Sequence, residues 1–207
     1  MSENRENSVR VGEYLNKSPK ERVYTLFEKY DSFSLWRNAY KESVVDYLVD
    51  VQECKRRRNA EGLGVRVQTS GTKASVVEAE AEERLSLEQC FEKKFISRDV
   101  LPDAYDRNYI SVAVYEWEMM KWEFGVLRMF IDRMKREDRA LFVPYMRKET
   151  NLDIIADQLC IERQSANKRV YRIRKAFLTE ILPWFEEYKI EITAYRIRRG
   201  RNESHGR

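Results

Sequence analysis

Residues 151–177 read "NLDIIADQLCIERQSANKRVYRIRKAF" and contain two helical patterns separated by a short break. The first pattern starts at Thr150-Asn151-Leu152-Asp153, where a capping residue is followed three positions later by an acid. Four apolar residues then supply the side that we expect to be buried: Ile154, Ile155, Ala156 and Leu159. The pattern predicts a first helix of barely two turns.

The second pattern follows a tight connection at Cys160-Ile161-Glu162. Its apolar residues are spaced four, three and four apart and therefore share one face of a helix: Ala166, Val170, Ile173 and Phe177. The opposite face carries Gln164, Lys168, Tyr171 and Lys175, and the flanks carry Arg163, Asn167, Arg172 and Arg174. Residues 161–177 hold six basic residues and one acidic residue, Glu162. We therefore expect a helix-turn-helix whose second helix is basic on its exposed side.

A basic helix of this kind fits the DNA major groove, which is about 12 Å wide and offers base edges and phosphates to Arg, Lys, Gln and Asn. The pattern predicts the following contacts with double-stranded DNA: Arg163, Gln164, Ser165, Asn167, Lys168, Tyr171, Arg172 and Lys175. The alternative is a helical hairpin whose basic helix is only solvated.

The same stretch resembles the helix-turn-helix of region 4 of the sigma-70 factors, where an E-I-A-E-x-L-G-I-S core precedes a basic helix ending in R-x-R-K. The matching positions are Ile155, Ala156, Leu159, Ile161, Arg174 and Lys175. The resemblance implies that Arg163, Gln164 and Lys168 read base edges, and that Asn167 and Arg172 contact bases or backbone.

Three residues depart from the sigma pattern. Cys160 replaces the usual turn glycine, Glu162 replaces the usual serine cap, and Ala166 is smaller than the expected valine or isoleucine. A cysteine is less suited than glycine to a left-handed turn. Ser165 is the alternative cap, and its use would move the start of the basic helix by three residues.

The layout of the whole chain is similar to that of the small phage-encoded transcriptional regulators of the ArpU and RinA type. That resemblance implies control of late or packaging genes in phages and prophages of Gram-positive bacteria. RNA polymerase is then a further candidate partner. The upstream regions of a sigma factor have no counterpart here, so a complete sigma role is not expected.

Composition favours an all-α protein. The 207 residues are 43% hydrophobic and 36% charged, with only seven glycines and four prolines. The net charge of +4 is uneven, because residues 160–207 contain 12 Lys/Arg and six Asp/Glu, which leaves 27 basic and 29 acidic residues in the remainder. The basic end is the C-terminal end, where a nucleic-acid partner would be expected.

Apolar periodicity and capping residues predict further helices over residues 18–30, 35–58, 76–95, 104–134 and 139–147, with Pro144 kinking the last of them. The first of these is expected to begin at a capping box, in which Ser18 caps the free N–H groups and Glu21 reaches back. The helix over 104–134 suits a core or a self-association helix, so a homo-oligomer is a candidate assembly. Five segments result: an N-terminal helical region at 1–60, a flexible loop or linker at 61–75, central helices at 76–135, the helix-turn-helix DNA-binding domain at 136–184 and a basic tail at 185–207.

Two basic runs outside the helix-turn-helix leave alternatives open. The first, Lys55-Arg56-Arg57-Arg58, is expected either to complement the dipole in the last turn of its helix or to make a second nucleic-acid contact. The second is the tail from Tyr195, with five arginines, expected to be a disordered arm that contacts phosphates or only aids solubility. Pro183 should end or kink the basic helix, and Trp184-Phe185 should fold back as an apolar cover.

The sequence lacks the residue patterns that several classes of function require. The three cysteines, Cys54, Cys90 and Cys160, have neither disulfide nor zinc spacing, and His205 is the only histidine. Acid pairs such as Glu116 with Glu118, or Glu186 with Glu187, point their side chains apart on a helix. We expect no catalytic residue, metal or cofactor. The alternatives are a DNA-acting enzyme anchored by the helix-turn-helix and a packaging protein like the small terminase subunit.

The expected location is the cytoplasm. The first ten residues, "MSENRENSVR", lack the apolar core of a signal peptide. No run of the chain approaches the roughly 18 apolar residues that span a bilayer, so a membrane partner is not expected.

Overall fold

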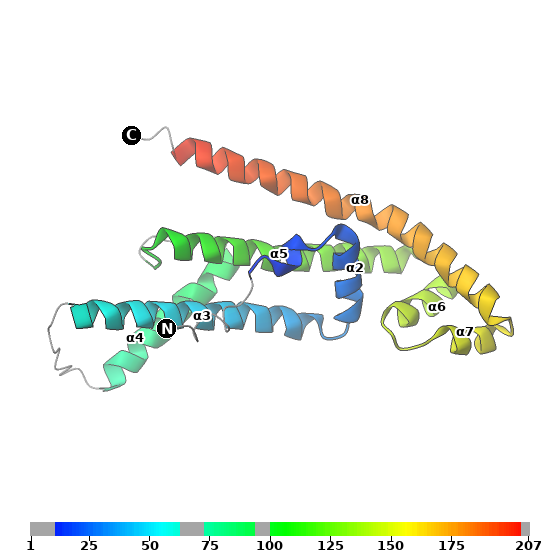
Figure 1. Cartoon of the computed structure of the whole chain (residues 1–207), viewed down its shortest axis with the longest axis horizontal. Helices are drawn as coiled ribbons and strands as arrows, with labels where there is room; N and C mark the ends of the chain where they lie inside the picture. Colours follow the sequence, from blue (N-terminus) through cyan, green and yellow to red (C-terminus); the bar gives the residue numbers. More distant parts are fainter. Residues whose placement is uncertain (1–10, 63–72, 94–99, 204–207) are drawn as a thin grey trace. The chain divides into compact units, whose positions relative to one another are not determined.

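The computed structural model describes residues 11–62, 73–93 and 100–203, and the side chains of residues 11–58, 78, 80–93 and 100–186. These described residues form eight α-helices and no strand (Figure 1), which confirms the all-α class. The helices are α1 (Glu13–Asn16), α2 (Pro19–Glu28), α3 (Phe33–Gly62), α4 (Lys73–Lys93), α5 (Ala104–Arg133), α6 (Arg136–Met146), α7 (Leu152–Leu159) and α8 (Arg163–Glu203).

Contacts within the chain define two units. Unit 1 consists of Met1–Asn16 and Ser34–Met120, and unit 2 consists of Lys17–Phe33 and Lys121–Arg207. Residues 17–33 therefore belong with the C-terminal part of the chain. The division into five segments expected from the sequence stays a prediction.

Unit 1 is built around the helical stripes of α3, α4 and the first half of α5. Its buried residues recur at three- and four-residue intervals, as a face that packs on a neighbouring helix requires. They include Val44, Val45 and Leu48 of α3, Leu87, Cys90 and Phe91 of α4, and Ile110, Ala113 and Val114 of α5. Arg37 and Trp117 add a reciprocal contact, since Arg37 Nε donates to the Trp117 carbonyl and Trp117 Nε1 donates to the Arg37 carbonyl.

Unit 2 has an aromatic core that joins α2, α6 and α8. The rings of Phe27, Phe142 and Phe177 contact one another with centroids 5.1 to 5.8 Å apart. Arg22 of α2 is fully buried, and its Nη2 donates to the carbonyl oxygen of Phe185 at 2.9 Å. These contacts hold α8 by its inner face and leave the other face available.

The start of α2 confirms the predicted capping box. Ser18 is the N-cap, Pro19 opens the first turn, and the Glu21 carboxylate accepts a hydrogen bond from the Ser18 backbone N–H at 2.8 Å. The hydrogen bonds from the Ser18 side chain and backbone hold the pKa of Glu21 below its ordinary value. All the interacting groups lie within four residues, which is why the local sequence predicts this structure.

The predicted loop at 61–75 falls mostly on residues 63–72, which lie outside the described residues. Its two ends are corrected: Glu61 and Gly62 belong to α3, and Lys73, Ala74 and Ser75 belong to α4. Because α3 continues to Gly62, the basic run at 55–58 does not form its last turn. The interpretation of that run as a complement to the helix dipole is therefore wrong.

Of the two alternatives expected for Pro183, an end of the basic helix is wrong, and a kink stays a prediction. Helix α8 continues through Pro183 to Glu203, so the prediction of a disordered arm fails over residues 195–203, and residues 204–207 lie outside the described ones. Proline removes one intrahelical hydrogen bond, but Ile181 and Phe185 on either side of it are buried in unit 2. Trp184 and Phe185 do not fold back, since both lie on α8.

Candidate nucleic-acid interface

Helix α7 begins at a side-chain cap. Asn151 Oδ1 accepts hydrogen bonds from the backbone N–H groups of Asp153 and Ile154, both at 3.0 Å, so the start predicted at Thr150 is one residue early. Ile155 and Ala156 are buried as expected. Ile154 is 44% exposed, so its predicted burial is wrong. An eight-residue helix that packs on one partner buries only one narrow face.

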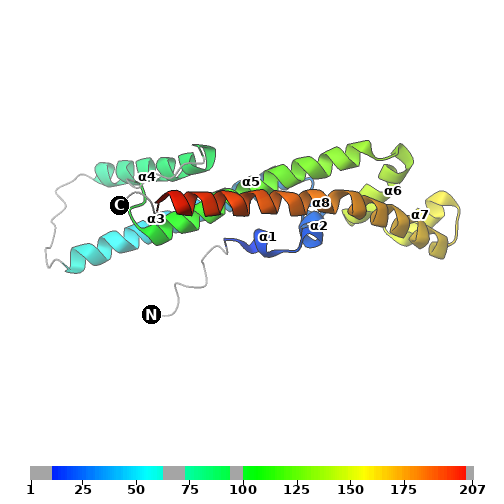
Figure 2. The same ribbon diagram turned by 90° about the horizontal axis from the view of Figure 1, so that it is seen from above.

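The connection to α8 is a Schellman turn. Cys160 has the left-handed conformation (φ 51°, ψ 44°), the Ile161 N–H donates to the Ala156 carbonyl at 3.0 Å, and the Cys160 N–H donates to the Asp157 carbonyl at 3.1 Å. The Ala166 N–H then donates to the Glu162 carbonyl at 3.0 Å, the first bond of α8. Helix α8 therefore starts directly after Glu162, and the alternative start at Ser165 is wrong. Figures 1 and 2 both show α7 beside the first turns of α8.

Replacing Cys160 with glycine is expected to raise the free energy of unfolding by about 1 kcal/mol, because glycine removes the steric cost of a left-handed residue. The Cys160 side chain is exposed, so little packing is lost. Chemical denaturation monitored by circular dichroism measures the change.

The control is Cys54→Gly, the same substitution at an exposed position inside α3. It is expected to lower stability by about 1 kcal/mol, since glycine is a poor helix former. Equal changes in stability at both positions would contradict a steric cost of the left-handed conformation at Cys160.

The inner face of α8 agrees with the predicted register. Ala166, Val170 and Phe177 are buried, and Ile173 is half-buried. Ala166 and Val170 pack with Ile155 and Ala156 of α7 and with Leu141 of α6. The small side chain of Ala166, fully buried in this cluster, is consistent with a close approach between α7 and α8.

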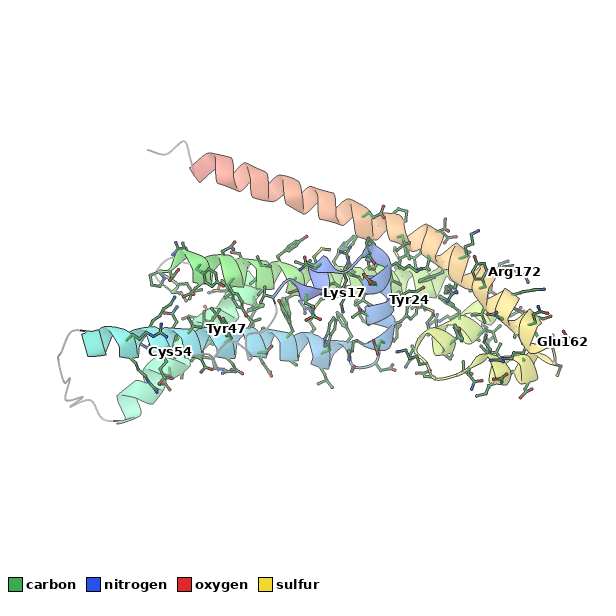
Figure 3. The ribbon with its side chains drawn as sticks, in the orientation of Figure 1. Lys17, Tyr24, Tyr47, Cys54, Glu162 and Arg172 are labelled. Carbon is green, nitrogen blue, oxygen red and sulfur yellow. The ribbon has the colours of Figure 1, made fainter. Side chains whose placement is uncertain are left out.

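The outer face of α8 carries every residue predicted to contact DNA. All eight are exposed: Arg163, Gln164, Ser165, Asn167, Lys168, Tyr171, Arg172 and Lys175, which we call the basic face. Figure 3 shows Glu162 at the start of α8 and Arg172 on its outer side. The structure brings these residues together on one surface, and their contact with DNA stays a prediction.

Ion pairs divide the cations of this region into two groups. Arg163 pairs with Asp153 of α7 at 2.9 Å, and Arg169 lies 3.7 Å from Glu137 and 4.0 Å from Asp138 of α6. Lys168, Arg172 and Lys175 have no ion-pair partner in the part of the chain that the structure describes. Their spacing of four and three residues places them in one stripe along α8.

Two features of the site were not evident from the sequence. One is the contact of Arg163 with Asp153, and the other is an open hollow of about 530 Å³ beside it, lined by residues of α2, the end of α6 and the start of α7. Both depend on how separate helices pack, and no local pattern signals them.

The basic run at 55–58 is a weaker candidate for a nucleic-acid contact than the sequence suggested. Lys55 pairs with Asp103 at 2.8 Å and Asp106 at 2.6 Å, and its hydrogen bond holds the pKa of Asp103 below the ordinary value. Arg56 pairs with Glu83, and Arg57 pairs with Glu53. Three of the four cations are thus neutralised within unit 1.

The described residues contain no group of three or more side chains that could hold a metal ion. Glu116, one of the acids considered for a metal pair, is buried and accepts hydrogen bonds from the backbone of Gly12, Tyr14 and Leu15. No helix within the described residues has the length and apolar character of a membrane span.

Comparisons with models of protein families, with curated proteins and with solved structures each gave no match. The function is therefore inferred from the residues of the chain itself.

Proposed function

We propose that this chain is a sequence-specific regulator of transcription that binds double-stranded DNA by placing the basic face of α8 in the major groove. The observation that carries the proposal is the exposed stripe of Lys168, Arg172 and Lys175, which lacks ion-pair partners among the described residues. Cations that are not neutralised within the protein attract phosphates, and this attraction supplies most of the non-specific affinity for DNA.

The neighbouring polar residues support reading of sequence in addition to attraction. Gln164 and Asn167 are exposed on the first two turns of α8, and side-chain amides pair with adenine edges in the major groove. Helix α7 supports the start of α8 through Ile155 and Ala156, in the manner of the first helix of a helix-turn-helix. The resemblance to sigma-70 region 4 and to phage regulators extends the proposal to late or packaging genes of phages and prophages.

If Lys168 reads a base, replacing it with alanine is expected to weaken binding to a selected DNA site by about 1–3 kcal/mol. If Lys168 contacts a phosphate, the same change is expected to reduce the salt slope by about 1, where the salt slope is the steepness with which the logarithm of the binding constant falls with the logarithm of the salt concentration. Because Lys168 is exposed, the fold should be retained. Fluorescence anisotropy with labelled duplexes, repeated at several salt concentrations, measures both quantities. Sites are first selected from fragments of the source genome.

Arg169→Ala is the matched control, because Arg169 is adjacent and carries the same charge but faces Glu137 and Asp138 of α6. It is expected to change DNA affinity much less than Lys168→Ala. Unchanged affinity and salt slope in both Lys168→Ala and Arg172→Ala would overturn the placement of the basic face in DNA.

A further inference from the structure

An ion pair joins α7 to α8 at the start of the basic face. Arg163 Nε lies 2.9 Å from Asp153 Oδ1, and the two side chains are 70% and 64% exposed. Pairs as exposed as this one add little to stability, because water and salt screen them. The main effect of the pair is therefore on the orientation of the Arg163 side chain.

Both partners stand on fixed backbone. Asp153 lies in the capped first turn of α7, where its own N–H donates to Asn151 Oδ1. Arg163 is the first residue of α8, and the two helices are packed together through Ile155, Ala156 and Ala166. A carboxylate held in this way can restrict an arginine that would otherwise sample many rotamers.

The contact uses one edge of the guanidinium group. Arginine has five N–H donors in a planar fork, and engagement of Nε by Asp153 leaves the Nη1 and Nη2 end available. That end matches the O6 and N7 acceptors of guanine, which arginine contacts in bidentate fashion in the major groove.

We infer that Asp153 is a positioning residue that orients Arg163 to read a guanine, an inference that rests on the proposed binding of DNA. Asp153 itself contacts no base in this arrangement. It lowers the entropy that Arg163 loses on binding, so its effect falls on discrimination between bases more than on attraction to phosphates.

The test compares the wild-type chain with Asp153→Asn, Arg163→Ala and Asp157→Asn. Asp157→Asn is the matched control, because Asp157 is an exposed carboxylate on the same helix with no ion-pair partner in the described part of the chain. Sites are selected from a random duplex library with the wild-type chain. Each guanine of the selected site is then replaced by adenine or by 7-deazaguanine, which lacks the N7 acceptor.

We expect one guanine whose replacement weakens wild-type binding but not binding by Arg163→Ala. At that position, Asp153→Asn should lower the preference for guanine over adenine about tenfold. Asp157→Asn should keep the wild-type preference. Both Asn variants should raise affinity for random duplex equally, since each removes one negative charge.

The outcomes separate the two proposals. If the wild-type chain selects no sequence, the proposed function is wrong and this inference falls with it. If a site is selected and Arg163→Ala loses the guanine preference while Asp153→Asn keeps it, Asp153 does not position Arg163 and the proposed function stands. If Arg163→Ala also keeps the preference, the assignment of guanine to Arg163 is wrong.

Discussion

Replacing Arg22 with methionine is expected to lower the free energy of unfolding of unit 2 by about 3–5 kcal/mol. Arg22 and Glu123 are both fully buried, with Arg22 Nε 3.0 Å from Glu123 Oε1. Methionine fills similar space but removes the positive charge that compensates a buried carboxylate. It also removes the donor to the Phe185 carbonyl. Urea denaturation monitored by circular dichroism and tryptophan fluorescence measures the loss.

The contact between Arg22 and Glu123 is chiefly electrostatic. Although the two atoms are 3.0 Å apart, neither Arg22 Nε nor Glu123 Oε1 has hydrogen-bond geometry. A double variant that replaces both charges with methionine should therefore recover most of the stability, because an apolar pair of similar volume often replaces a buried ion pair without loss. Arg22→Lys keeps the charge but not the planar fork of donors, so its stability should lie between that of Arg22→Met and that of the double variant.

The double variant also tests whether the buried charge of Glu123 is the source of the loss. If Arg22→Met and the double variant lose the same stability, the cost arises from packing or from the lost donor to Phe185, and the buried charge is not its source. A loss below about 1 kcal/mol in Arg22→Met would mean that water or another group of the protein compensates the Glu123 carboxylate in place of Arg22.

The features that the sequence predicted are those whose partners lie close together in the chain. The capping box of Ser18 and Glu21 spans four residues, and the stripe of Ala166, Val170 and Phe177 follows from the period of one helix. The same stripe determined which residues of α8 are exposed. For this reason the exposed face of the site could be predicted without knowledge of the fold.

Features that depend on distant partners could not be predicted. Arg22 is one of 39 basic residues, and nothing next to it in the sequence signals that it is buried against Glu123 and the Phe185 carbonyl. Pro183 shows the reverse case: a local rule predicted an end or a kink there, and the helix does not end, because Ile181 and Phe185 on either side of the proline are held by packing. Within the site, the pairing of Arg163 and Arg169 with acids required the placement of α6 and α7.

Replacing Glu116 with glutamine is expected to lower the free energy of unfolding by about 2–3 kcal/mol. The buried carboxylate accepts four hydrogen bonds: from the backbone N–H groups of Gly12, Tyr14 and Leu15 at 2.7, 2.6 and 3.2 Å, and from the Tyr40 hydroxyl at 2.5 Å. Glutamine has the same shape, but its NH₂ group places a donor against donors. The start of α1 would then lose its acceptor, and thermal or urea denaturation measures the cost.

Tyr40→Phe is the graded control, because it removes one of the four donors and keeps the carboxylate. Burial, and next the negative charge of Glu116, raise the pKa of Tyr40 well above its ordinary value, so the hydroxyl remains a donor at neutral pH. Tyr40→Phe should cost about 1 kcal/mol, less than Glu116→Gln, because the three backbone donors still have their acceptor. A Tyr40→Phe cost equal to that of Glu116→Gln would show that the hydrogen bonds from the backbone of Gly12, Tyr14 and Leu15 add nothing to the stability of unit 1. In that case Glu116 would act only through Tyr40.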